Sequence, residues 1–312
     1  MSSSTLVQQT RNEDRNKEYA RIVRHLHTGN SIAVTILMLL AAIVIVIFLG
    51  VIVLLLVQGI VYVFNPAFYS TASAAANVSI APELFNTVYL LVLSEIFLVP
   101  ISLAAAIYLV EYAQQGPLVT IIHFAAETLS GIPSIVLGLF GVIAFVISFH
   151  TGLSRIAGAL TLLCLNLPVA LRLFEQALAA VPRDLREGGL ALGATKWRVI
   201  RTVVIPSALP GVITGIILTA GRVIGETAAL VFTTGATNPP NVYSLNPFIP
   251  SDTLTIHLWY IKTAGAGTAG LSSAQATAVA AGSSTLLIII LFVINIVSRS
   301  LGRLIERRLT AA

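Results

Sequence analysis

Charged residues are scarce in this sequence of 312 residues. Asp, Glu, Lys and Arg together make up 10% of it, whereas 56% of the residues are hydrophobic. Soluble domains carry about 25% charged residues. A soluble chain of this composition would expose large apolar patches, so the composition argues against a soluble globular protein. The mean hydropathy of +0.92 and the long uncharged stretches predict an integral membrane protein.

Cysteine is also nearly absent. The single Cys164 cannot form a disulfide within the chain, and its hydrophobic surroundings predict a small core residue. The sequence contains no Walker A glycine loop for nucleotide phosphates, and His123, His150 and His257 are scattered without metal-ligand spacing. We therefore expect no enzymatic activity, no metal site and no bound cofactor in this chain alone.

Long apolar stretches predict an all-α membrane fold with six spans. A helix needs about 20 apolar residues to cross a bilayer. The first stretch is longer than that and carries no charge, so it predicts one tilted or projecting span. The third contains SGIP at 130–133, a break that can line a cavity. The predicted spans are 31–64, 84–110, 119–149, 155–180, 203–234 and 273–298.

The basic residues give the predicted orientation. Most of the 18 Lys and Arg residues lie in the tail 1–30, in the loop 181–202 or in the tail 299–312. Six spans would place these three segments on one side, and basic loops stay in the cytoplasm. Both termini are therefore predicted to be cytoplasmic, and the positive charge does not indicate nucleic-acid binding. The long loop 235–272 falls on the other side, with an amphipathic segment predicted near 253–263.

The loop between the fourth and fifth predicted spans has its own pattern. It reads VPRDLREGGLALGATKWRVIRTVVIPSALPG over residues 181–211. Pro182 favours a helix start, Gly193 interrupts the pattern, and Trp197 places an apolar ring among basic residues. These features predict a short amphipathic helix, a glycine turn and a second short helix at the membrane face. A plain surface helix lying on lipid headgroups is the alternative interpretation.

This loop resembles the EAA signature of ABC importer permeases. Glu187, Gly193 and Pro206 occupy the matching positions, while Gly188 and Gly189 replace the usual alanines. The glycine pair should weaken the first helix by about 1 kcal/mol per residue. The resemblance implies that residues 182–206 form coupling helices which dock on a cytoplasmic ATPase. The residues expected to carry this contact are Glu187, Gly193, Ala194, Trp197 and Pro206.

Four further strings resemble phosphate permeases of the PstA type. They are AAAIYLVEYA (104–113), AETLSGIPSIVLGLFG (126–141), LNLPVALRLFEQAL (165–178) and GRVIGETAALVFTTG (221–235). The resemblance implies a MetI-like type-1 permease domain over residues 83–298, preceded by the additional span 31–64. It also implies a bacterial cell membrane location and import of inorganic phosphate by alternating access.

The same resemblance implies a set of partners. They are a homologous second permease (PstC type), two ATPase subunits (PstB type) and an extracytoplasmic phosphate-binding protein (PstS type), besides membrane lipid. ATP and Mg²⁺ would bind the ATPase partner, and no nucleic acid is expected.

Arg222 and Glu226 stand inside an apolar run, TAGRVIGETAALV. Their spacing of four places them on one face of a predicted helix, and Arg172 of the fourth span could approach Arg222 near mid-membrane. A charge there is costly unless it faces protein or water. One interpretation is a salt bridge that fixes the helix packing. The other, favoured by the resemblance, is an anion pathway that contains Arg222, Glu226, Arg172 and Thr227.

The chemistry of phosphate fits the second interpretation. A guanidinium presents a fork of donors to phosphate oxygens, and a carboxylate can accept the O–H of protonated phosphate. Sulfate has no such proton at neutral pH and would be repelled by Glu226. Sulfate, molybdate or phosphonate remain alternative substrates. An ion-coupled secondary transporter and a sensor or assembly subunit are more distant alternatives, and Glu95, Glu127 and Glu175 have no assigned role.

Overall fold

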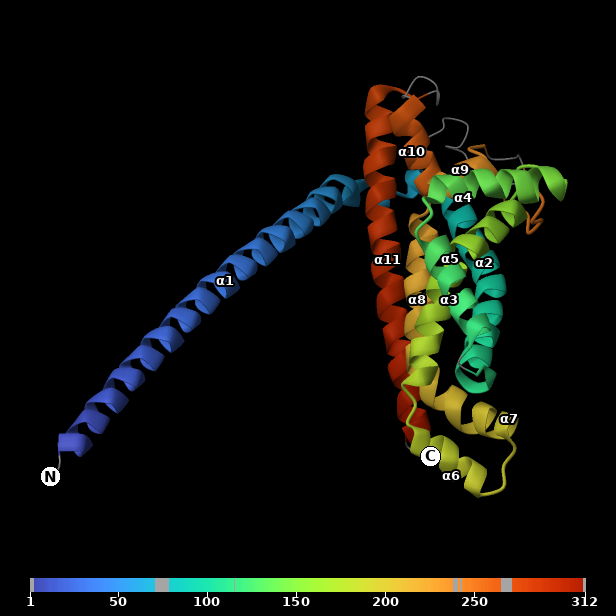
Figure 1. The fold of residues 1–312 in the computed structure, drawn as a ribbon. Coiled ribbons are helices and arrows are strands. Elements are labelled where there is room, and N and C mark those ends of the chain that lie inside the picture. Colours follow the sequence, from blue (N-terminus) through green and yellow to red (C-terminus); the bar gives the residue numbers. More distant parts are fainter. Residues whose placement is uncertain are drawn as a thin grey trace. The chain divides into compact units, whose positions relative to one another are not determined.

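The computed structural model describes residues 3–70, 79–114, 116–237, 241, 243–264 and 271–310, with side chains from residue 30 onward except at residues 298, 301 and 303–310 (Figure 1). These residues form helices and connecting turns, with no β-strand among them. The chain divides into two units, Met1–Val57 and Gln58–Ala312. Among the described residues, five helices are long and apolar enough to cross a membrane, or six if a bent helix pair is counted as one span.

Helix α1 (Ser3–Val63) begins in the first unit and ends in the second. Its segment Asn30–Val63 is the most apolar candidate span, with a hydropathy of 3.6. Leu37 and Val46 are representative of this segment, with exposed fractions of 65% and 69%. An uncharged helix that is apolar on all sides suits contact with lipid chains, and its bounds agree with the predicted span 31–64.

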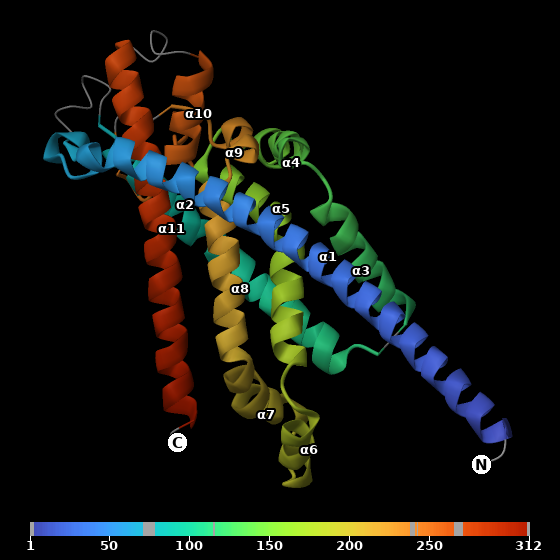
Figure 2. The same ribbon diagram turned by 90° about the vertical axis from the view of Figure 1, so that its left-hand side faces the viewer.

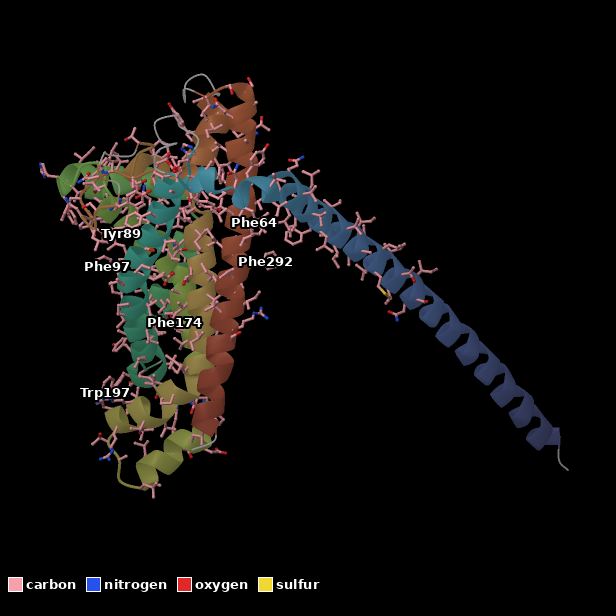
Figure 3. All side chains as sticks on the ribbon, turned by 180° about the vertical axis from the view of Figure 1, so that it is seen from behind. Phe64, Tyr89, Phe97, Phe174, Trp197 and Phe292 are labelled. Carbon is pink, nitrogen blue, oxygen red and sulfur yellow. The ribbon has the colours of Figure 1, made fainter. Side chains whose placement is uncertain are left out.

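Four long helices build the second unit (Figure 2). They are α2 (Ala81–Ile107, continued as a π-helix over Tyr108–Tyr112), α5 (Arg155–Ala179), α8 (Ile205–Gly225) and α11 (Ser273–Thr310). α5 packs between α2 and α8, and α8 packs against α11. Small residues allow the close approach, since a Cβ at Gly215 would meet the Phe174 ring at 2.8 Å. Phe174 is 1% exposed and lies in the middle of the bundle (Figure 3).

The predicted span 119–149 is a bent pair of helices. Its residues form α3 (Pro117–Ser130) and α4 (Ser134–Gly141, continued as a π-helix over Val142–Ser148), which are bent by 102°. Pro133 explains the break, because proline disfavours the helical conformation of the residue before it. Helix α4 packs on α9 so closely that a Cβ at Gly138 would lie 2.7 Å from the Cα of Ala229. The break expected at SGIP is confirmed.

The predicted end of the span 203–234 is wrong. α8 stops at Gly225, Glu226 has an extended backbone (φ −73°, ψ 129°), and α9 covers only Ala228–Thr233. The Glu226 carboxylate accepts a hydrogen bond from the backbone N–H of Ala229 at 3.2 Å. This contact satisfies one of the free N–H groups at the start of α9, so the sequence itself supplies the acceptor that supports a new helix start.

The loop after α5 folds as the sequence predicts. It contains α6 (Arg183–Ala191), a turn at Gly193 with φ +80°, and α7 (Lys196–Val199). A positive φ favours glycine. A π-helical segment, Ile200–Val204, then joins α7 to α8. α6 and α7 lie at one end of the bundle and α10 (Leu254–Ala264) lies at the other (Figure 1). Below, these are called the α6–α7 end and the α10 end.

The segment around α10 is anchored to the bundle by Arg155, a residue that sequence reasoning did not single out. Its side chain is fully buried. Nη2 donates to Asn86 Oδ1 at 2.6 Å, Nη1 donates to the backbone oxygen of Ser244, and the guanidinium lies 4.6 Å from the ring centre of Tyr89. The segment expected near 253–263 forms α10, which is apolar on most of its surface rather than clearly amphipathic. A short 3₁₀-helix, Pro66–Tyr69, follows α1.

Candidate functional site

Arg172 forms an ion pair with Glu127 inside the apolar segments. Arg172 lies on α5 and Glu127 on α3, and Arg172 Nη2 is 2.9 Å from Glu127 Oε1. A second, longer pair lies beside it, with His123 Nε2 3.8 Å from Glu175 Oε1. These four residues are called the α3–α5 charged cluster. His123 and Glu127 are four residues apart on α3, and Arg172 and Glu175 are three apart on α5. Residues at these spacings share one helical face, so each helix presents two of the four side chains together.

The α3–α5 charged cluster is open to the outside of this chain. The exposed side-chain fractions are 41% for Arg172 and 66% for Glu127, and 43% for His123 and 14% for Glu175. Charges within a membrane face protein or water rather than lipid, because exposure to lipid is costly. The open face of α3 and α5 therefore needs a water-filled path or another protein against it.

Arg222 lies on an exposed stripe of α8. The stripe repeats every three or four residues and contains Ser207, Gly211, Thr214, Leu218 and Arg222. A Cβ at Gly211 would lie 2.7 Å from the Cβ of Ala177 on α5. The stripe therefore borders the helix that carries Arg172. Because Arg222 lies in the last turn of α8, it lies further from mid-span than the sequence predicts.

The two arginines lie at different depths along neighbouring helices. α5 and α8 run in opposite directions, and Gly215 meets Phe174 at the same level. Arg222 follows Gly215 by seven positions and Arg172 precedes Phe174 by two. At about 1.5 Å per residue, Arg222 lies about 7.5 Å nearer the α10 end than Arg172. The expectation that the two side chains meet is not supported by any contact among the described residues.

The shared helical face predicted for Arg222 and Glu226 is wrong, because α8 ends between them. No ion pair of Arg222 is found within the described part of the chain. Glu226 instead joins three helices: it follows α8, its carboxylate caps α9, and its backbone oxygen accepts a hydrogen bond from Thr255 Oγ1 on α10 at 3.1 Å. Thr227 is partly buried in the same junction, where its backbone oxygen accepts from Val231 N at 3.0 Å.

The α6–α7 end presents a separate surface. Glu187 is exposed, and Leu192 and Trp197 are 90% and 56% exposed. Trp197 lies at this end of the molecule in Figure 3. A depression between α6 and α7 is lined by Gly189, Leu192, Gly193, Ala194, Arg198, Val199, Thr202 and Val203.

Two contacts hold α6 in place. A Cβ at Gly189 would lie 2.9 Å from Cγ2 of Val199, so glycine allows α6 to lie directly on α7. Arg186 Nε donates to Glu111 Oε1 at 2.9 Å, and Arg186 Nη2 donates to the backbone oxygen of Leu178 at 2.7 Å. These bonds tie α6 to the ends of α2 and α5. A force applied to α6 would therefore reach both helices. Pro206 lies in the first turn of α8.

Comparisons with known proteins support a permease. A probable ABC transporter permease protein, YqgI, of Bacillus subtilis is 41% identical over 256 residues, which cover 78% of this chain and 85% of YqgI. The phosphate transport system permease protein PstA of Mycobacterium leprae is 40% identical over 152 residues, 49% of this chain and 50% of that protein. The match to this PstA thus spans about half of either protein.

Solved structures share the fold. An inward-facing structure of the MetNI methionine ABC transporter has a TM-score of 0.59 at 19% identity, over 76% of this chain and 99% of that one. A bacterial ABC transporter that imports alginate has a TM-score of 0.54 at 15% identity, over 76% and 82% of the two chains. The family model for binding-protein-dependent transport system inner membrane components matches residues 98–311. The chain belongs to this family of ABC importer permeases with the MetI-like fold.

Proposed function

We propose that this chain is a membrane permease subunit of an ATP-driven importer for inorganic phosphate. The observation that carries the proposal is the Arg172–Glu127 ion pair, which is 2.9 Å long and exposed on one side of largely apolar helices. A second permease on that face would enclose a polar path. The names of the PstA relatives support phosphate as the substrate.

Phosphate would meet the two arginines in turn. Arg222 lies nearer the α10 end and carries no ion pair among the described residues. Arg172 lies deeper and is already held by Glu127. A guanidinium binds phosphate oxygens through paired N–H donors. We assign the first contact to Arg222 and the second to Arg172, where the anion would displace Glu127.

Displacement of Glu127 also permits release. A site with unopposed positive charge would hold the anion too tightly for transport. Glu127 competes with phosphate for Arg172 and can return to Arg172 when the anion leaves. A protonated phosphate can donate its O–H to a carboxylate, whereas sulfate cannot. We therefore assign discrimination between the two anions to Glu127 at Arg172, and to Glu226 and Thr227 at the end of α8.

ATP hydrolysis is assigned to partner subunits. We propose that the surface made by Glu187, Gly193, Ala194 and Trp197 docks on ATPase subunits of the PstB type, which bind ATP and Mg²⁺. Pro206 then starts the helix that carries the motion to Arg222. For the transport step, this chain itself would need no cofactor. A PstC-type permease would complete the pathway, and a PstS-type protein would deliver phosphate.

The α6–α7 end is proposed to face the cytoplasm, together with both termini. The concentration of Lys and Arg in these segments supports this orientation in a bacterial cell membrane. The α10 end would then receive the phosphate-binding protein.

Uptake by the reconstituted complex tests the proposal. Proteoliposomes containing this chain, the second permease and the ATPase should accumulate radiolabelled phosphate only when ATP and the binding protein are both present. Sulfate in tenfold excess should compete weakly. Uptake that is unaffected by omitting ATP, or that sulfate suppresses as strongly as unlabelled phosphate does, would contradict the assignment.

A further inference from the structure

Three side chains of types that bind metal ions lie close together at the α10 end. They come from separate segments of the chain. Glu83 comes from the first turn of α2, Asp252 from the segment before α10, and His257 from α10 itself. One ligand atom from each residue lies within 4.8 Å of the others. None of these residues belongs to the pathway or to the coupling surface described above.

The distances suit one small cation. His257 Nδ1 is 2.8 Å from Asp252 Oδ2 and 3.9 Å from Glu83 Oε1. Two ligands of a tetrahedral Zn²⁺ site, each about 2.1 Å from the metal, lie about 3.4 Å apart. The observed distances lie on either side of this value, so shifts of about half an ångström would bring the three atoms around a metal.

Two of the three side chains are buried, His257 is partly buried, and hydrogen bonds fix the backbone beside them. Their exposed side-chain fractions are 6% for Glu83, 4% for Asp252 and 16% for His257. Asn86 Nδ2 donates to the backbone oxygen of Asp252 at 2.9 Å, and Thr87 Oγ1 accepts from Leu254 N at 3.0 Å. α2 therefore holds the segment that supplies Asp252 in register with Glu83, and the ligand positions are set before any ion arrives.

The charges of the group also favour a cation. Two buried carboxylates face one imidazole within this group. A divalent ion would neutralise both.

We propose that Glu83, Asp252 and His257 bind one divalent transition-metal ion of the Zn²⁺ class, which clamps α10 to the start of α2. One imidazole nitrogen and two carboxylate oxygens form a mixed ligand set that suits Zn²⁺ better than Mg²⁺ or Ca²⁺, which prefer oxygen ligands alone. Three protein ligands leave a fourth position for water. The clamp would fix the surface that a substrate-binding protein approaches.

Metal content and spectroscopy test the proposal. The full chain, purified within its transporter complex, is stripped with a chelator and equilibrated with Zn²⁺, and bound metal is measured by mass spectrometry. Wild-type protein should hold about one Zn²⁺ per chain more than each of the variants E83Q, D252N and H257Q. Its affinity for Zn²⁺ should be at least tenfold higher than that of each variant. H150N is the matched control, because His150 is exposed and lies outside the group; it should bind like wild type.

A Co²⁺ measurement on the unaltered protein keeps the test decisive if the variants fold poorly. Co²⁺ in a tetrahedral site of this kind should give visible absorption that Zn²⁺ displaces. Equal Zn²⁺ content in wild type and all three variants, or no displaceable Co²⁺ spectrum, would overturn the proposal and leave a hydrogen-bonded His257–Asp252 pair beside Glu83. Neither result would bear on the proposed phosphate transport, because the test measures metal binding without phosphate.

Discussion

At the scale of single residues, the exposure of a charged pair determines how much its removal should lower stability. The Arg172–Glu127 pair is exposed by 41% and 66%, and such pairs contribute little to stability. Arg172→Gln should abolish most phosphate uptake while membrane abundance stays close to that of wild type. Glu127→Gln should lower the phosphate concentration for half-maximal uptake, because Arg172 loses its internal competitor. Radiolabelled uptake per transporter measures both effects.

Gln176→Ala is the matched control for this pair, since Gln176 is exposed one turn further along α5. It should transport phosphate normally. If Arg172→Gln lowered abundance as much as uptake, the pair would be a structural link between α3 and α5, and the anion path would have to lie elsewhere.

Arg222 and Glu226 are separated by the end of α8, so their substitutions should behave independently. Arg222→Gln should reduce phosphate uptake at least tenfold without loss of protein, because the side chain is exposed. Glu226→Gln keeps an oxygen that can accept from Ala229 N, so α9 should persist. It removes the charge, so competition by sulfate should rise. Uptake assays with labelled phosphate and unlabelled sulfate measure both.

The double variant of Arg222 and Glu226 separates a pathway from a buried salt bridge. A buried pair would show low abundance in each single variant and recovery in the double. We expect neither the loss nor the recovery, because Glu226 caps α9 instead of pairing with Arg222. Normal phosphate uptake and normal sulfate exclusion by the double variant would exclude both residues from the pathway.

At the scale of helices, the two adjacent glycines of α6 have different roles. A Cβ at Gly189 would lie 2.9 Å from Val199 Cγ2, whereas nothing lies within 4 Å of a Cβ at Gly188. Gly189→Leu should separate α6 from α7 and uncouple ATP hydrolysis from transport. Gly188→Ala should preserve coupling and stabilise α6 by about 1 kcal/mol. The ratio of ATP hydrolysed to phosphate imported reports the difference.

Gly188→Leu is the size-matched control for Gly189→Leu. Equal coupling ratios in the two leucine variants would mean that contact between α6 and α7 is not needed for coupling. Gly193→Val would add strain of a different kind, since its φ of +80° disfavours a β-branched residue.

At the scale of the whole molecule, the proposed orientation predicts which ends of the bundle a reagent can reach. Leu192 is 90% exposed at the α6–α7 end and Leu245 is 74% exposed at the α10 end. In a chain without Cys164, Leu245→Cys should react with an impermeant thiol reagent added to intact cells. Leu192→Cys should react only in inverted vesicles from which the ATPase has been removed. Cysteines at Ser4 and Thr310 should behave like that at Leu192.

Adding the ATPase back should protect Leu192→Cys, because the coupling surface would be covered. Labelling of Leu192→Cys in intact cells would reverse the orientation. Persistent labelling in the presence of ATPase would move the docking surface away from α6 and α7.

The sequence by itself determined the features that depend on local chemistry. Apolar length predicts the spans around α1, α2, α5 and α11, because a bilayer demands a minimum run of apolar residues. Gly193 and Pro182 predict the turn and the start of α6, because backbone freedom and proline geometry act within a few residues. The signature around Glu187 predicts the family for the same reason, since its pattern lies in one short loop.

Only the tertiary structure decided which charges meet. Arg222 and Glu226 are close in sequence, but α8 ends between them because Glu226 caps α9 and bonds to Thr255 of α10. Arg172 and Glu127 are distant in sequence but meet because α3 and α5 pack together. Glu83 meets His257 for the same reason. Ion pairs and metal-ligand sets depend on distances in space, and helix packing sets those distances between segments that have no local relation in the chain.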